Sequence, residues 1–427
     1  MIDLKRLRQD PAGSRASLMR RGDPSVATTI DSILEQDRRR RDLLVQAEAL
    51  KAERNAASDE VARRKRARES ADDLMEQLKA SGEEVKRLDG RLREIDASLE
   101  GLVLTVPNFL DDRVPDGDTS ANRLVRSWGS PPGFDFVPKP HWELGASLGL
   151  LDLAAGVKVA GSGFPLFTGI GAKLGRALAG FMIDLHTREH GYLEVAPPYL
   201  VNRATLTGTG QLPKFAEEVY ACPADDLFLI PTAEVPVTNI HREEILEAKA
   251  LPATYVAYTP CFRREAGSHG KDTRGLIRVH QFDKVELVRI VRPEESPAEH
   301  ERMTAHAEVV LQRLGLPYRV VELAAGDTGF ASARTYDLEV WAAGVGLWLE
   351  VSSSSTFTDF QARRANLRYR PEPKGKPEFV HTLNASGVAF PRTIIALLEN
   401  NQAADGSVRV PEALVPYLGV DRLTPRA

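Results

Sequence analysis

Apolar residues near the amino terminus recur at the spacing of a coiled coil. From about 71 to 102, a leucine, isoleucine or valine returns at alternating intervals of four and three residues, with Ser81 in one position of the series. The preceding stretch, about 27 to 70, holds no glycine or proline. We therefore predict two long helices packed as an antiparallel hairpin, an arm of roughly 60 Å. The weaker stripe of the first helix is Ile30, Ile33, Leu44, Ala47 and Val61.

Beyond the arm, helical and alternating patterns succeed one another. Proline, glycine and aspartate are frequent between 107 and 137, which is typical of a linker. Amphipathic helices are predicted at about 172–189 and 296–314, and strands at 227–235 and 347–355. No GxGxxG or GxxxxGK[ST] opens a helix, which excludes the common nucleotide-binding loops.

Composition and charge indicate a globular protein without a membrane segment. The 427 residues carry a net charge of −4, and no apolar run approaches 18 residues. The charged first residues are unlike a signal peptide, so a cytoplasmic location is expected. The two cysteines, Cys222 and Cys261, lie far apart, and we predict no structural zinc.

Positive charge gathers on the first predicted helix of the arm. Residues 38 to 68 hold eleven lysines or arginines against five acidic residues. Such a run is most often a solvated helical face, but a basic rod on an acidic protein also suits an RNA backbone. The candidate RNA-binding residues are Arg38, Arg41, Arg54, Arg63, Arg64, Lys65 and Arg66.

The stretch from 261 to 287 is the strongest candidate for a ligand site. It predicts two strands with a polar connection, and Arg263 and Glu265 share one face of the first strand. On the second strand Phe282 and Glu286 share a face about 13 Å apart, enough for a ring at one end of a ligand and a carboxylate at the other. A solvated hairpin is the alternative. The density of arginine, carboxylate and aromatic residues on one face favours a site.

Three further segments carry candidate chemistry. Thr232 and Glu234 share a face of the 227–235 strand. They are either a polar pair at the end of the strand or part of a site that binds an ammonium group. Glu350 ends an apolar strand beside hydroxyls, which suits Mg²⁺ on phosphates. Alternation puts Ser353 opposite Glu350, so this strand must end or twist near Ser352. Arg392 follows Pro391 at the start of a helix and suits a triphosphate or, alternatively, caps a surface helix.

These segments together resemble class II aminoacyl-tRNA synthetases, and the seryl-tRNA synthetase family in particular. Phe-Arg-Arg-Glu at 262–265 is similar to motif 2, and the likeness continues to residue 287. The segment from 139 to 202 is similar to the one that leads into and forms motif 1. Residues 381–400 resemble motif 3. Thr-Ala-Glu at 232–234 resembles the family's serine-binding element, and Glu350, Ser352 and Ser353 its Glu-x-Ser-Ser element. The likeness spans nearly the whole chain, and the basic arm matches the family's tRNA-binding arm.

The resemblance implies an α+β fold: a helical coiled-coil arm (1–106), a linker (107–137) and a catalytic domain (138–427) with a mostly antiparallel sheet flanked by helices. It implies an ATP-dependent serine–tRNA ligase that forms seryl-adenylate and charges tRNA(Ser), and also tRNA(Sec). It further implies a homodimer and Mg²⁺. A duplicate synthetase for antibiotic tolerance or biosynthetic serine supply, or a non-catalytic RNA-binding relative, remains the alternative.

The resemblance also assigns residues to ligands. The catalytic residues are Arg263, Glu350 and Arg392, with Mg²⁺ on Glu350 and Ser353. The implied ATP contacts are Arg263, Arg264, Glu265, Val279, Phe282, Glu350, Val351, Ser352, Ser353 and Arg392. The implied serine contacts are Thr232, Ala233, Glu234, Arg263, Glu286, Asn384 and Ser386. Three positions depart from the family pattern: Gly163, Ala385 and Pro391.

Overall fold

The computed structural model describes residues 1–266 and 274–426, and the chain divides into two compact units. One unit comprises Ile2–Met19 and Asp23–Pro107. The other comprises Met1, Arg20–Gly22 and the chain from Asn108 onward. Among the helices of the described residues, none is long and apolar enough to cross a membrane.

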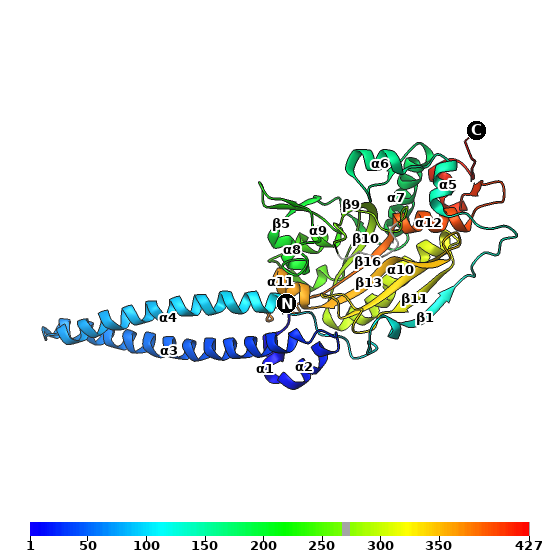
Figure 1. Ribbon diagram of the computed structural model, residues 1–427. Coiled ribbons are helices and arrows are strands. Elements are labelled where there is room, and N and C mark those ends of the chain that lie inside the picture. Colours follow the sequence, from blue (N-terminus) through cyan, green and yellow to red (C-terminus); the bar gives the residue numbers. More distant parts are fainter. Residues whose placement is uncertain (267–273, 427) are drawn as a thin grey trace. The chain divides into compact units, whose positions relative to one another are not determined.

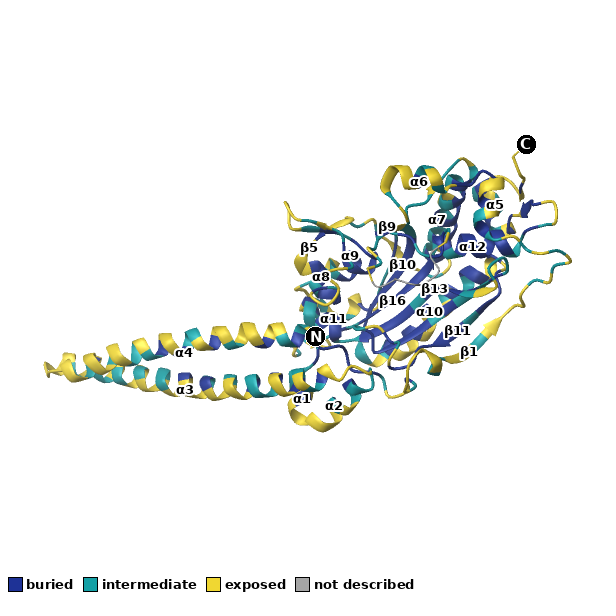
Figure 2. Cartoon of the chain, viewed as in Figure 1, coloured by how far each residue is buried: buried dark blue, intermediate teal, exposed yellow. Residues whose placement is uncertain are grey.

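The first unit is dominated by a helical hairpin (Figure 1) of α3 (Ser25–Ala67) and α4 (Asp72–Leu104), after the short helices α1 (Leu4–Gln9) and α2 (Pro11–Met19). An apolar seam of Leu43 and Ala47 on α3 packs against Leu88 and Leu92 on α4. Ion pairs join Arg40 to Asp96, Lys51 to Asp89 and Arg64 to Asp73, so residue numbers fall along α4 as they rise along α3, and the helices are antiparallel. Exposed and partly exposed residues make up most of the remaining surface of both helices (Figure 2). The predicted hairpin is confirmed, except that Leu43 rather than Leu44 is the deeply buried residue.

The second unit is built on an eight-stranded sheet in the order β1-β11-β12-β13-β16-β10-β9-β4. All neighbouring pairs are antiparallel except β4 with β9, which is parallel. The predicted fold class is thereby confirmed. The strands are β1 (Arg123–Trp128), β4 (Leu193–Glu194), β9 (Ala253–Phe262), β10 (Gln281–Val291), β11 (Tyr318–Glu322), β12 (Arg334–Ala342), β13 (Leu347–Thr358) and β16 (His381–Ala389).

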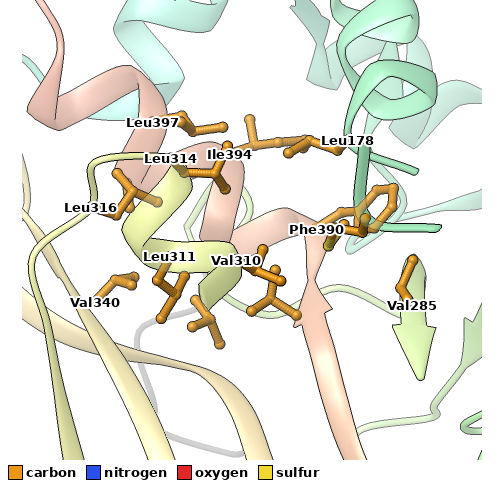
Figure 3. Close-up of a cluster of buried hydrophobic side chains, with 14 of the residues drawn as sticks. Leu178, Val285, Val310, Leu311, Leu314, Leu316, Val340, Phe390, Ile394 and Leu397 are labelled. Carbon is orange, nitrogen blue, oxygen red and sulfur yellow. The ribbon is translucent and has the colours of Figure 1, made fainter. Parts of the chain in front are cut away.

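Three helices, α7 (Ile170–Arg188), α10 (Ser296–Arg313) and α12 (Phe390–Asn400), pack on one face of this sheet. Figure 3 shows part of the resulting core, where Ile394 of α12 lies among Leu178, Val310 and Leu314. On β10, Val285 and Leu287 belong to this core. Because side chains alternate along a strand, Lys284 and Glu286 point to the opposite face of the sheet, where the cavity described below lies.

Smaller elements complete the second unit. Its other helices are α5 (His141–Ser147), α6 (Leu153–Ala160), α8 (Arg203–Thr209), α9 (Glu234–Thr238), α11 (Phe360–Ala365) and α13 (Val415–Leu418). Its short strands are β2 (Leu151–Asp152), β3 (Leu166–Phe167), β5 (Leu200–Asn202), β6 (Ala221–Cys222), β7 (Leu227–Leu229), β8 (Ile245–Glu247), β14 (Arg368–Arg370), β15 (Glu378–Phe379), β17 (Val408–Arg409) and β18 (Arg422–Leu423).

Two local expectations were wrong. The strand predicted for 227–235 ends at Leu229, and α9 begins at Glu234, because Pro231 cannot donate to a ladder and the chain turns there. The stretch predicted as a linker contains β1, whose backbone pairs with β11 at the sheet edge. Proline and glycine frequency indicated an irregular segment, whereas pairing with a strand about 200 residues away gives part of it regular structure.

Candidate active site

A cavity of about 710 Å³ opens on the sheet face opposite the helical core. The two central strands β13 and β16, the neighbouring β10 and the segments that follow β7 and β9 supply much of its wall. Of the predicted ligand contacts, thirteen line it: Thr232, Glu234, Arg263, Glu265, Val279, Phe282, Glu286, Glu350, Val351, Ser353, Asn384, Ser386 and Arg392. Segments more than 150 residues apart in sequence therefore meet at one site.

The predicted motif 2 hairpin is formed by β9 and β10, but its polar residues lie differently from the expectation. β9 ends at Phe262, so Arg263 and Glu265 follow the strand, and Glu265 has a positive φ of 51°. Arg263 lies over the Phe282 ring, with Cζ 5.2 Å from its centroid. Glu265 accepts a hydrogen bond from Arg278 at 2.9 Å. The connection predicted between the strands lies largely outside the described residues.

One end of the cavity is a buried cluster of opposite charges. Lys284 donates to Thr232 Oγ1 at 2.9 Å and forms an ion pair with Glu286. Ser386 donates at 3.5 Å to Oε2 of Glu286, the same oxygen that pairs with Lys284. Lys284 is a residue to which sequence reasoning gave no role. Its signal was its position on the polar face of the strand, between Phe282 and Glu286.

Glu234 lies beside this cluster and receives a hydrogen bond from Gln361 Nε2 at 2.5 Å. Burial, and after it the neighbouring Glu286, raise the pKa of Glu234 to about 7 against the opposing effects of Gln361, Lys284 and Arg263. Gln361, which comes from α11, was not predicted. The cluster thus presents carboxylates and hydroxyls that can bind an ammonium group and a hydroxyl.

The opposite end of the cavity depends on a bulge in β13. The pairing with β12 shifts register, since Leu338 faces Ser352 whereas Glu339 faces Glu350, so Val351 is the extra residue. The bulge puts Glu350 and Ser353, three residues apart, on the cavity side. The predicted twist near Ser352 is confirmed in this form.

Arg392 opens α12 directly after Pro391, and its guanidinium donates to the Glu350 backbone oxygen at 2.8 Å. It also donates to the Ile277 carbonyl oxygen at 3.2 Å. The alternative of a surface cap is wrong, because Arg392 lines the cavity.

The residues around Glu350 fit a divalent cation. Asp337 on β12 faces Ser353 across the ladder, and its Oδ1 is buried without a hydrogen-bond partner among the described atoms. Burial and the nearby Glu350 carboxylate hold the pKa of Asp337 well above its usual value. A hard cation at Glu350 would offset the negative charge of both carboxylates. Asp337 was not predicted, because its relation to Glu350 depends on a strand pairing.

Three predicted contacts do not reach the cavity. Arg264 is exposed, and its backbone N–H bonds the Glu218 carbonyl oxygen. Ala233 is fully buried beneath the surface of the cavity. Ser352 donates its hydroxyl to the Ser386 carbonyl oxygen at 2.6 Å, because the bulge turns it to the other side of β13. These residues support the wall of the site but are not part of its lining.

Of the departures from the family pattern, one has a clear structural reason. Gly163 has a φ of +79°, and a Cβ there would lie 2.5 Å from His280 Cδ2. Ala385 is fully buried in the helix-packed core, and Pro391 lines the cavity in the first turn of α12. All three are compatible with the described geometry.

The predicted RNA-binding residues all lie on α3, and several of them form ion pairs with acidic residues. Arg38 contacts Glu35 and Asp42, Arg41 contacts Asp37, and Arg63 and Arg64 contact Glu60. Lys65 and Arg66 are exposed near the end of the helix, and Arg54 is half-buried on the hairpin. The pairs of Arg38 with Glu35 and Asp42 are exposed and cost little to exchange for phosphate partners, whereas Asp37, the partner of Arg41, is buried.

Histidines of the second unit form one further cluster. His186 and His190 have the HxxxH spacing, which the prediction of no structural zinc overlooked, and their Nδ1 atoms lie 2.9 Å apart. Within the described residues, no group of three or more histidine, cysteine or acidic side chains is arranged to hold a metal ion. Cys222 and Cys261 are both free thiols.

Comparison with known proteins covers both units. The family model "Seryl-tRNA synthetase N-terminal domain" matches residues 1–110, and "tRNA synthetase class II core domain (G, H, P, S and T)" matches 220–401. The chain is 53% identical to serine–tRNA ligase of Pelobacter propionicus over 98% of this chain and 99% of that protein. It is 54% identical to that of Geobacillus kaustophilus over the same shares. Seryl-tRNA synthetase from Pyrococcus horikoshii complexed with ATP matches with a TM-score of 0.95 at 37% identity, covering both chains fully.

Proposed function

This chain belongs to the seryl-tRNA synthetase family, and from that premise we propose how its cavity activates serine for transfer to tRNA. Its relatives are ATP-dependent serine–tRNA ligases, and they lend no support to a specialised duplicate or a non-catalytic RNA-binding role. The observation that carries the proposal is the convergence of a buried, polar subsite and an arginine-rich subsite in one cavity.

In the first step the serine carboxylate attacks the α-phosphorus of ATP in line, and pyrophosphate leaves. The attacking group is already ionised, so the protein supplies position and charge rather than a base. Arg263 bridges the serine carboxylate and the α-phosphate, and Arg392 binds the γ-phosphate. Adenine stacks on Phe282 beside Val279, with Glu265 at its exocyclic edge. Stacking there requires the Arg263 guanidinium to leave its place over the ring.

Glu350 and Ser353 would hold Mg²⁺, with Asp337 behind them. The cation supplies charge neutralisation of the triphosphate when bound. Two protein ligands are enough, because Mg²⁺ keeps waters and phosphate oxygens as its other ligands.

Serine is bound at the buried end. Glu234 and Thr232 hold its ammonium group, and Glu286 accepts the side-chain hydroxyl, with Ser386 and Asn384 completing the wall. Serine displaces Lys284 from part of its contact with Glu286. Alanine is rejected because it would leave these buried polar groups unpaired.

In the second step a hydroxyl of the terminal tRNA ribose attacks the carbonyl carbon of seryl-adenylate, and AMP leaves. Residues 1–106 act as the arm that binds tRNA(Ser), and tRNA(Sec) as well, and residues 138–427 act as the catalytic domain. The enzyme acts as a homodimer through the elements that resemble motif 1.

The test is amino-acid-dependent ATP–pyrophosphate exchange with serine, threonine, alanine, cysteine and glycine. Exchange should be strong with serine alone. Glu286→Gln should lower kcat/KM for serine roughly 10- to 100-fold, the value of a hydrogen bond to a charged group. The control, Glu294→Gln on the exposed surface, should not. Equal serine kinetics in both variants would overturn the assignment of the serine subsite.

A further inference from the structure

A fully buried hydrogen-bonded pair, His141 and Glu399, joins α5 to α12 outside the cavity. The Nδ1 atom of His141 lies 2.8 Å from Glu399 Oε1, and the His141 backbone N–H donates to the same oxygen at 2.8 Å. The other oxygen, Oε2, accepts from the backbone N–H groups of Gly344 and Val345 at 2.8 and 3.1 Å. Glu399 is therefore held from both sides, and it holds the imidazole ring in turn.

This arrangement defines which ring nitrogen carries the proton. With Glu399 accepting at Nδ1, the neutral ring is protonated there, and Nε2 is an acceptor. The backbone N–H of Leu276 donates to Nε2 at 3.0 Å. Gly275 allows this approach, since a Cβ there would lie 2.2 Å from Nε2 and its φ is +68°.

The segment that His141 holds leads into the cavity. Leu276 and Ile277 both line it, and the Ile277 carbonyl oxygen accepts from Arg392 Nε at 3.2 Å. Arg392 and Glu399 lie on the same helix, α12, about two turns apart. Residues 275–277 are thus clamped between the His141 ring and the Arg392 guanidinium.

We propose that His141, oriented by Glu399, is a positioning residue for serine activation, which acts through Leu276 and Ile277 to aim Arg392 at the ATP phosphates. The inference rests on the proposed function, in which Arg392 is a phosphate ligand. His141 does not line the cavity and touches no substrate. Its effect should therefore fall on ATP and not on serine, whose subsite is built by other segments.

Two substitutions separate this role from a merely structural one. In His141→Asn the amide nitrogen replaces Nδ1 and keeps the bond to Glu399, but no acceptor remains for Leu276. In His141→Gln the longer side chain places its oxygen near the Nε2 position and keeps the bond to Leu276, but loses the donor to Glu399. Each variant loses one buried hydrogen bond, so both should melt at similarly lowered temperatures.

The experiment is pyrophosphate exchange with ATP and serine varied in turn, together with thermal melting. His141→Asn should raise the KM for ATP roughly tenfold, which is about 1.4 kcal/mol and within the worth of one hydrogen bond. Its KM for serine should not change, and the kinetics of His141→Gln should stay close to those of the unsubstituted protein.

An equal rise of the ATP KM in both variants, or a parallel rise for ATP and serine, would overturn the proposal. If His141→Asn does not fold, Gly275→Ala replaces it, because its Cβ pushes the segment off an intact ring. An unchanged ATP KM in Gly275→Ala would overturn the proposal too. Arg392→Ala is measured alongside. An unchanged ATP KM in Arg392→Ala would overturn both the assignment of Arg392 and this inference. If the ATP KM of Arg392→Ala rises, the assignment of Arg392 stands, and the His141 variants alone test the inference.

Discussion

At the scale of single residues, one buried amide controls the charge of the proposed serine subsite. Gln361 donates through Nε2 to Glu234 Oε1 and to the Thr209 carbonyl oxygen at 3.2 Å, and its Oε1 accepts from Thr382 at 2.7 Å. A carbonyl oxygen can only accept, so the amide orientation is defined. Gln361 thereby stabilises the ionised form of Glu234 against burial and against Glu286.

A pH dependence of serine binding follows. The pKa of Glu234 is raised to about 7, so its ionised fraction falls as the pH drops through neutrality and the serine KM rises. Gln361→Met keeps the volume but removes the donor, which raises this pKa. The acid limb of kcat/KM for serine should move to higher pH by roughly one unit, the equivalent of one hydrogen bond. Pyrophosphate exchange across about pH 6 to 9 measures it.

The matched control is Gln312→Met, which removes a glutamine hydrogen bond to Tyr318 away from the cavity. Its pH profile should coincide with that of the unsubstituted protein. The role assigned to Gln361 is wrong if the two variants give the same profile, or if the limb of Gln361→Met moves to lower pH.

At the scale of elements, the exposed end of α3 is the part of the arm most available to RNA. Replacing Lys65 and Arg66 together by alanine should raise the KM for tRNA(Ser) in aminoacylation and leave pyrophosphate exchange unchanged. The slope of log affinity against log salt should also become shallower by roughly one to two. Each phosphate contact that is lost reduces the number of counterions released when RNA binds. Filter binding at several salt concentrations measures the slope.

The charge-matched control for the arm is Lys374→Ala with Lys376→Ala, on an exposed turn of the second unit. It removes the same charge, so it tests whether net charge alone explains the effect. Identical salt slopes in the two double variants would contradict a specific role for the end of α3.

The same contrast between elements explains what the sequence could predict. The arm helices were predicted within about three residues, because the heptad repeat is a local pattern. The polar face of motif 2 was predicted in part, since Phe282 and Glu286 lie on the same face of one strand. The irregularity in β13 was predicted near Ser352, but its form as a bulge at Val351 was not, because the bulge depends on pairing with β12. Gln361 and Asp337 carry no local signal, as their partners lie on other strands and helices.

At the scale of the whole molecule, the proposed homodimer makes a prediction about mass. The chain has a mass of 47.0 kDa, and β4 is a terminal strand of the large sheet on which Leu193 is 62% exposed. An exposed apolar residue on an edge strand is a liability unless another chain covers it. β4 also follows α7 in the segment that resembles motif 1. Analytical ultracentrifugation should therefore give twice the chain mass at micromolar concentration.

Leu193→Glu should shift this equilibrium towards the single chain. In a two-fold symmetric interface each substitution counts twice, so two carboxylates would be buried at once. We expect the dissociation constant to rise at least about 100-fold, in keeping with the cost of unpaired buried charges. Val137→Glu, at a position 87% exposed outside the motif 1 segment, introduces the same charge and should leave the mass unchanged. A single-chain mass for the unsubstituted protein at all concentrations would refute the dimer. Equal behaviour of the two variants would instead place its interface away from β4.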